Sequence, residues 1–152
     1  MSDQFTLSAA ILKTLRDIVG EDKVRLDAES LDTYGKDWTK VHVPKPSAIV
    51  FPKTVEQVQA IVRLANEHEL ALVPSGGRTG LSGGAVAAHG EIVVAFDAMN
   101  QISDFNPVDR SVVCQAGVIT EQLQQFAQEQ GLFYPVDFAS SGSSQIGGNI
   151  GT

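Results

Sequence analysis

The chain has 152 residues, of which 43% are apolar and 19% are charged. This length supports one folded domain with its own core, and the apolar content excludes a disordered chain. The net charge is −7, and after Arg78 there is one basic residue against seven acidic residues. Because a nucleic-acid surface needs a basic patch, we expect no nucleic-acid partner. All apolar runs are far shorter than the ~18 residues of a membrane span, so we expect no transmembrane segment.

The chain begins with a predicted helix and a connector. Apolar residues recur with helical periodicity over residues 8–19, and Gly20 is suited to end the helix. Residues 21–45 are rich in charges and have little periodicity, so we interpret them as a connector. We expect its aromatic side chains, Tyr34 and Trp38, to anchor it in the core, and stacking on a ligand ring is the alternative.

A strand–helix–strand unit follows the connector. Residues 47–51 form an apolar strand, and Thr54 begins an amphipathic helix with a capping-box pattern. Residues 70–73 form a second strand, which Pro74 ends. Two strands joined by a helix within roughly thirty residues are typical of a βαβ unit with a parallel pair of strands.

The second half of the chain is predicted to hold three strands, one helix and a terminal loop. These are strands at 91–96, 111–115 and 132–134, a helix at 120–130, and a loop of small residues at 140–152, called here the C-terminal segment. A boundary at residues 84–90 would divide the chain into two α+β lobes, each with its own helix and strands.

Residues 74–84 form a glycine-rich loop in which five of the eleven residues are glycine. A purely structural loop is one interpretation, because glycine adopts the positive φ angles of tight turns, and we expect such angles at Gly77 and Gly80. Glycine also lets successive backbone N–H groups converge on an oxyanion. Arg78, Thr79 and Ser82 could add a charge and two hydroxyl donors, so we favour phosphate binding.

The glycine-rich loop fits neither of two common nucleotide-binding motifs. It contains no lysine, which a Walker loop requires. Its glycine spacing differs from G-x-G-x-x-G, and the residues after it are too rich in glycine to begin an amphipathic helix. Since the loop is expected to join the two lobes, a long ligand with a diphosphate in its middle could lie between them.

Residues 47–84 resemble the first half of the FAD-binding domain of the p-cresol methylhydroxylase (PCMH) and vanillyl-alcohol oxidase family. The glycine-rich loop is similar to the pyrophosphate loop of that family. Pro135-Val136-Asp137, Gly142-Ser143 and Ile146-Gly147-Gly148-Asn149-Ile150-Gly151-Thr152 are similar to its second flavin-contacting segment. Within the family, the sequence most resembles the D-2-hydroxy-acid dehydrogenases, the branch of D-lactate, glycolate and D-2-hydroxyglutarate enzymes.

This resemblance implies two groups of FAD contacts. The group at the diphosphate comprises Gly76, Gly77, Arg78, Thr79, Gly80, Leu81 and Ser82. The group toward the riboflavin end, with the loop that leads to it, comprises Pro135, Asp137, Gly142, Ser143, Gly147, Gly148, Asn149 and Thr152. Some members of the family attach FAD through a histidine in the first loop, and Arg78 stands at that place here, so the resemblance implies non-covalent FAD.

The implied fold class is α+β, a truncated two-lobed FAD-binding domain of PCMH type with a small βαβ lobe and part of a larger mixed-sheet lobe. Residues 1–46 would form the N-terminal helix and connector, and residues 47–152 an FAD-binding domain that is incomplete at its C-terminus and lacks the substrate domain. The implied activity is oxidation of a D-2-hydroxy acid to the 2-oxo acid by hydride transfer to flavin N5. We name no catalytic residue and expect the chain alone to be inactive.

Two other hypotheses remain open: a non-catalytic FAD- or nucleotide-binding fragment or assembly module, and glycine loops that bind nothing tightly. No metal site is expected, because the three histidines lack metal-binding spacing and the single cysteine, Cys114, cannot form a cluster. The lone cysteine suits a cytoplasmic protein, with a peripheral membrane position as the alternative for the intact enzyme. An incomplete second sheet predicts a homo-oligomer or association through an open strand edge.

Overall fold

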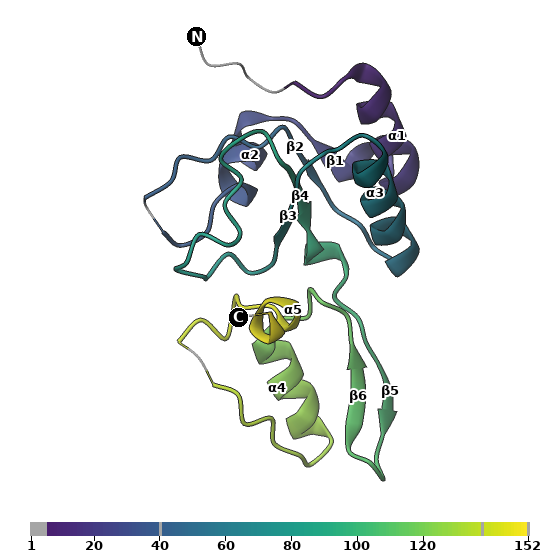
Figure 1. The fold of residues 1–152 in the computed structure, drawn as a ribbon. Helices are drawn as coiled ribbons and strands as arrows, with labels where there is room; N and C mark the ends of the chain where they lie inside the picture. The colour runs from purple at the N-terminus through teal and green to yellow at the C-terminus, as the bar shows by residue number, and fades with distance from the viewer. Residues whose placement is uncertain (1–5, 40, 138, 152) are drawn as a thin grey trace.

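The computed structural model describes residues 6–39, 41–137 and 139–151. Figure 1 shows two lobes, which the chain connects just after β4. The elements, in chain order, are α1 (Ala9–Val19), η1 (Glu21–Lys23), β1 (Val24–Arg25), α2 (Ala28–Tyr34), β2 (Ala48–Val50), α3 (Val55–Glu67), β3 (Leu72–Ser75), β4 (Ile92–Ala95), η2 (Phe96–Ala98), β5 (Ile102–Asn106), β6 (Ser111–Cys114), α4 (Thr120–Glu129) and α5 (Ile146–Ile150).

The first lobe is built on a four-stranded sheet with the order β1-β2-β4-β3. Strand β4 runs parallel to both β2 and β3, and β1 is antiparallel to β2. The strand–helix–strand order of the predicted unit is confirmed, but its two strands are not neighbours, because β4 lies between them. All four residues of β4 are buried, as expected for a central strand whose sequence is wholly apolar.

Both faces of this sheet are covered by helices. Alternate strand residues point to opposite faces, so Val50 and Ile92 pack with α1 and α3, whereas Ile49 and Val93 pack on the side of α2. Figure 1 shows α1 and α3 on one side of the sheet and α2 on the other. In α1, the predicted periodicity is confirmed by the burial of Leu15.

The predicted connector contains ordered elements that sequence patterning did not reveal. Strand β1 pairs with β2, and helix α2 is capped by Asp27, whose carboxylate accepts a hydrogen bond of 2.8 Å from the Ser30 N–H. The two residues of β1 and the seven of α2 are too few for a periodic pattern to stand out. The division of the chain at residue 46 stays a prediction.

The predicted lobe boundary at residues 84–90 is wrong. Strand β4 comes after these residues and is nevertheless the central strand of the first sheet, so the change of lobe follows η2. The glycine-rich loop therefore connects β3 to β4 within the first lobe and does not link the two lobes. The longest helix, α3, has 13 residues, and no helix in the described part of the chain is long and apolar enough to cross a membrane.

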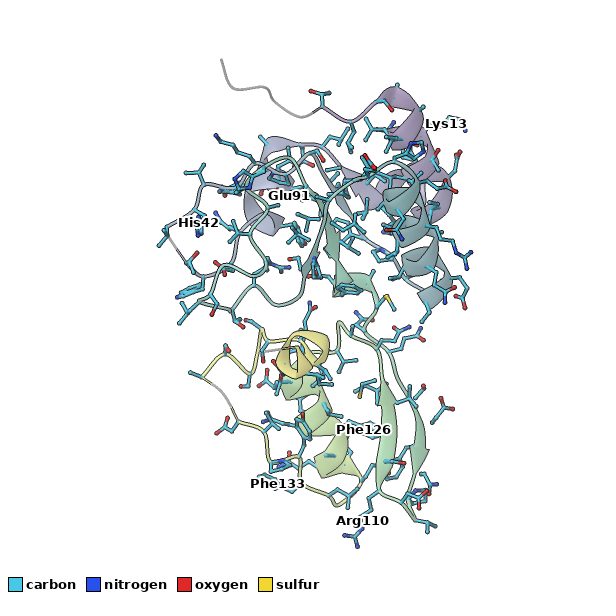
Figure 2. All side chains as sticks on the ribbon, viewed as in Figure 1. Lys13, His42, Glu91, Arg110, Phe126 and Phe133 are labelled. Atoms are coloured by element: carbon cyan, nitrogen blue, oxygen red, sulfur yellow. The ribbon has the colours of Figure 1, made fainter. Side chains whose placement is uncertain are left out.

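The second lobe consists of the antiparallel hairpin β5–β6 with α4 and α5 beside it (Figure 1). Its core comprises Val118, Leu123 and Ile146, and Phe126 on α4 lies edge-on to the Phe105 ring of β5, with 5.6 Å between their centroids (Figure 2). Strand β5 was missed because its ISDFN sequence is largely polar.

Two predictions for the end of the chain are wrong. Residues 132–134 form no strand, and Phe133 is 85% exposed at the surface of the second lobe (Figure 2). Part of the C-terminal segment, predicted as a loop, forms the helix α5 despite its two glycines. Gln145, the residue before α5, is held by an isolated β-bridge to Ile119. This bridge positions the start of α5, a helix whose glycines give it a poor helix propensity.

Candidate functional site

The glycine-rich loop starts from the carboxyl end of the parallel strands. Ser75, the last residue of β3, is paired with Ala95, the last residue of β4. Ligands of open sheets with parallel strands bind at this end, because the connecting loops gather there. Helix η2 starts at the same end, directly after β4, and brings Asp97 beside the loop.

The first glycines of the loop lie directly against the C-terminal segment. A Cβ atom at Gly77 would stand 2.1 Å from the carbonyl oxygen of Ser143, which no side chain can occupy without a backbone shift. A Cβ at Gly76 would lie 3.4 Å from Oε1 of Gln145. The structure therefore brings together the two glycine-containing segments that sequence analysis identified separately. They meet through backbone atoms at Gly77 and through the Gln145 side chain at Gly76.

Two buried polar atoms at this junction have no hydrogen-bond partner within the described residues. They are the hydroxyl of Ser75, which is 0% exposed, and Oε1 of Gln145, which is 5% exposed. Buried polar groups in proteins almost always have a partner, so a polar ligand group at this junction would satisfy both atoms. Neither residue was predicted as a site residue. The available signal was that Ser75 precedes Gly76 and that Gln145 lies two positions before Gly147.

The side chain of Arg78 faces the protein. One guanidinium nitrogen donates to the carbonyl oxygen of Gly76 at 2.7 Å, and the group pairs with the Asp97 carboxylate at 3.3 Å. The guanidinium carbon lies 4.5 Å from the centre of the Tyr34 ring. Tyr34 in turn makes an edge contact with Phe51, so it packs as the anchor that was expected. Its ring also stacks, but the partner is the Arg78 guanidinium and not a ligand ring. A direct contact between Arg78 and a phosphate stays a prediction.

The later part of the loop is attached to the residues that follow α2. The Asp37 carboxylate accepts hydrogen bonds from the N–H groups of Gly83 at 2.9 Å and Thr39 at 2.8 Å. The Trp38 N–H donates to the carbonyl oxygen of Gly80 at 3.0 Å. Burial acts to raise the pKa of the Asp37 carboxyl, but the hydrogen bonds from Thr39 and Gly83 together outweigh it and hold the pKa below its ordinary value.

Several sequence expectations for the loop need correction. Within the described residues of the loop, positive φ angles occur at Arg78 and Gly83, not at Gly77 or Gly80. Trp38, expected to anchor the connector in the core, is 71% exposed. The remaining predicted contacts of this loop lie at its surface or near it: Leu81 and Ser82 are exposed, and Thr79 is half-buried.

The C-terminal segment is fixed to the start of α4 by a buried polar network. The Thr120 hydroxyl, which is fully buried, lies 2.7 Å from the Ser144 hydroxyl and accepts a hydrogen bond of 2.7 Å from the Asn149 amide. A Cβ at Gly147 would stand 2.8 Å from the Cβ of Ala116, so this glycine permits close packing. Thr120 was not predicted as a site residue, because a hydroxyl residue at the start of a helix ordinarily serves as a helix cap.

The other predicted residues of the second group lie farther out on the lobe. Gly142 and Ser143 are exposed, and a Cβ at Gly148 would meet open space. Pro135 and Asp137 are exposed in the loop after α4, which the Gln124 side chain ties down through a hydrogen bond of 2.8 Å to the Val136 carbonyl. Thr152 lies outside the described residues. Among the residues with described positions, no three His, Cys, Asp or Glu side chains are grouped to hold a metal ion.

Comparison with known proteins identifies the class to which this site belongs. The family described as "FAD binding domain" matches residues 46–152. The chain belongs to this family.

Curated relatives include the D-2-hydroxyglutarate dehydrogenase of Stutzerimonas stutzeri, which is 68% identical over 143 residues, or 94% of this chain and 31% of the relative. The mitochondrial D-2-hydroxyglutarate dehydrogenase of Arabidopsis thaliana is 35% identical over 97% of this chain and 26% of the relative. The chain thus spans under a third of the length of these relatives.

Two solved structures share the fold. An alkyldihydroxyacetonephosphate synthase matches all of the chain and 30% of its own length with a TM-score of 0.89 at 19% identity. A p-cresol methylhydroxylase matches 86% of this chain and 26% of its own with a TM-score of 0.71 at 26% identity. The predicted fold class, an α+β FAD-binding domain of PCMH type, is confirmed.

Proposed function

We propose that the chain is the FAD-binding portion of a flavoprotein dehydrogenase that oxidises a D-2-hydroxy acid, D-2-hydroxyglutarate in the first instance, to the 2-oxo acid. The substrate class is supported by the names of relatives up to 68% identical. The observation that carries the proposal is the junction of the glycine-rich loop with the C-terminal segment, where two buried polar atoms lack a partner within the described residues.

The residues at this junction fit the chemistry of FAD. The backbone around Gly76 and Gly77 carries no side chain that would block a diphosphate, and its N–H groups can donate to phosphate oxygens. The hydroxyl of Ser75 can donate and the amide of Gln145 can accept, so both would find partners in a ligand with phosphates, hydroxyls and N–H groups. We propose that these residues hold the diphosphate half of FAD.

The second group of predicted residues would orient the flavin half. The hydrogen bonds of Thr120 with Ser144 and Asn149 fix the backbone of this segment, which supports a rigid surface for a ring system. Bound FAD would supply the hydride acceptor, and the protein supplies binding, orientation and exclusion of water. We assign no residue of this chain to removal of the proton from the substrate hydroxyl.

We further propose that FAD is held without a covalent bond. Arg78 occupies the place where a flavin-linking histidine can stand in the family, and its guanidinium is engaged by Gly76 and Asp97. Denaturing the loaded protein with acid or heat should release all of its flavin into the supernatant. Yellow colour that stays with the precipitated polypeptide would contradict this.

The central test is titration of the purified chain with FAD, followed by flavin absorbance and fluorescence. We expect saturable binding, and an unchanged flavin spectrum at stoichiometric protein would contradict the proposed function. The loaded chain is then mixed anaerobically with D-2-hydroxyglutarate, D-lactate or glycolate. We expect no reduction by the chain alone; stoichiometric bleaching by one acid would show that these residues suffice for chemistry.

We also propose a cytoplasmic location. A separate proposal is that two copies of the chain associate through the hairpin of the second lobe. The support for association is that β5 and β6 pair only with each other, so each leaves one edge unpaired by the other described strands. Light scattering across a concentration series should show a mass that rises with concentration. A constant monomer mass would contradict the association.

A further inference from the structure

We propose that Asp37 is a positioning residue for the diphosphate: it holds residues 80–84 of the glycine-rich loop in the conformation that FAD requires. This inference rests on the proposed FAD site. Nothing in the sequence points to Asp37, which lies in the segment predicted as a connector and is 46 positions away from its loop partner, Gly83.

Asp37 uses both carboxylate oxygens to fix backbone groups. One oxygen accepts from the Gly83 N–H at 2.9 Å, and the other accepts from the Thr39 N–H at 2.8 Å. A third hydrogen bond joins the same two segments, from the Trp38 N–H to the Gly80 carbonyl at 3.0 Å. The Asp37 side chain is 7% exposed, so these hydrogen bonds are shielded from water and are stronger than at the surface.

The glycines of this part of the loop have little packing of their own. A Cβ at Gly84 would meet no atom within 4 Å, and a Cβ at Gly80 would meet only the Asp37 carboxylate, at 4.0 Å. Gly83 has a φ angle of +77°, a conformation that few other residues adopt. A Cβ at Gly83 would lie 3.6 Å from the His42 ring, which is an ordinary contact. Packing around residues 80–84 is therefore sparse, and their hydrogen bonds to residues 37 and 38 supply much of the restraint.

The charge of Asp37 argues against a direct contact with the ligand. A carboxylate repels a diphosphate, and this one already has an N–H donor on each oxygen. Asp37 is therefore suited to act through the backbone: it orients Gly83 and, through Trp38, the Gly80 carbonyl. Arg78 does not neutralise it, because its guanidinium pairs with Asp97.

The test compares Asp37→Ala and Asp37→Asn with a control, Asp27→Ala. Asp27 also accepts from a backbone N–H, at 2.8 Å, but it caps α2. Binding of FAD, ADP and riboflavin is measured for each variant at a temperature where circular dichroism shows it to be folded. Asp37→Ala should weaken FAD and ADP by about tenfold or more, which corresponds to loss of a hydrogen bond to a charged group, and leave riboflavin unchanged.

The conservative variant Asp37→Asn and the control Asp27→Ala sharpen this result. Asp37→Asn keeps one acceptor oxygen and should lose less affinity than Asp37→Ala, and Asp27→Ala should bind FAD and ADP as the wild type does. Equal FAD binding by Asp37→Ala and the wild type would overturn the proposal. An equal loss for FAD, ADP and riboflavin would also overturn it, because that pattern indicates general destabilisation.

Hydrogen exchange separates this proposal from the proposed function. The Gly83 amide should be protected in the ligand-free wild type and should exchange at least about tenfold faster in Asp37→Ala. If the wild type binds no FAD, the proposed function fails, and this exchange measurement alone decides whether Asp37 restrains the loop. Equal exchange in both proteins would overturn that restraint.

Discussion

The two parts of the glycine-rich loop are held in place by different means. Gly76 and Gly77 pack against the backbone of the C-terminal segment, so here glycine is required for space. Gly80, Gly83 and Gly84 have room around them, and the hydrogen bonds of residues 37 and 38 restrain them. Glycines that are at most eight positions apart in one continuous motif are therefore required for different physical reasons, and substitutions should separate them.

The largest effect is expected from Gly77→Ala. The new Cβ would stand 2.1 Å from the Ser143 carbonyl oxygen, so the two segments must move apart. We expect the free energy of unfolding to fall by about 1–3 kcal/mol or more and FAD binding to be lost. Urea denaturation and FAD titration measure the two effects.

Gly84→Ala is the matched control, because its Cβ would meet nothing within 4 Å. Its stability should stay within about 0.5 kcal/mol of the wild type. Similar losses in Gly77→Ala and Gly84→Ala would show that close approach does not distinguish the two parts of the loop.

A moderate effect is expected at Arg78, which lies between the two parts and has a φ angle of +58°. Arg78→Ala removes the ion pair with Asp97 and the hydrogen bond to the Gly76 carbonyl but keeps the cost of a side chain in a left-handed conformation, so we expect a loss of about 1–2 kcal/mol from the lost contacts. Arg78→Gly removes the same contacts but tolerates the angle, and should regain about 1 kcal/mol relative to alanine. Equal urea midpoints for the two variants would show that the angle carries no cost.

The smallest effect concerns acid. Because the pKa of Asp37 is lowered in the folded chain, its carboxylate stabilises the fold above the unfolded pKa of about 3.9 and loses this contribution as the pH falls through the lower, folded value. The stability difference between the wild type and Asp37→Asn should therefore shrink from about pH 5 to about pH 3. A difference that stays constant over this range would contradict a charged Asp37 at the loop.

Sequence patterning predicted the elements whose information is local. Helix α3 has both a capping Thr54 and an apolar face, and β4 is a wholly apolar run, so each was found within a few residues of its bounds. Strand β1 and helix α2 are too short to show a period. The position of β4 between β2 and β3 is a property of pairing, which the order of elements in the chain does not determine.

For the candidate site, the sequence indicated the two backbone segments but not the side chains that fix them. Glycine clusters mark close approaches, so Gly77 and Ser143 could be named before their contact was known. Thr120 and Asp37 are ordinary polar residues in the sequence, and their roles depend on partners 24 and 46 positions away. Such pairings arise only when the chain has folded.

The position of β4 beside β3 limits which changes of length the glycine-rich loop can tolerate. Two parallel neighbours need a connection that returns across the sheet, and a helix usually supplies it. Between β3 and β4 the return path is residues 76–91, which include most of the glycine-rich loop. The proposed ligand-binding element is thus also the crossover that lets the central strand enter the sheet. Insertions or deletions there would alter sheet assembly together with binding, and a ligand that orders the loop would raise the stability of the first lobe by mass action.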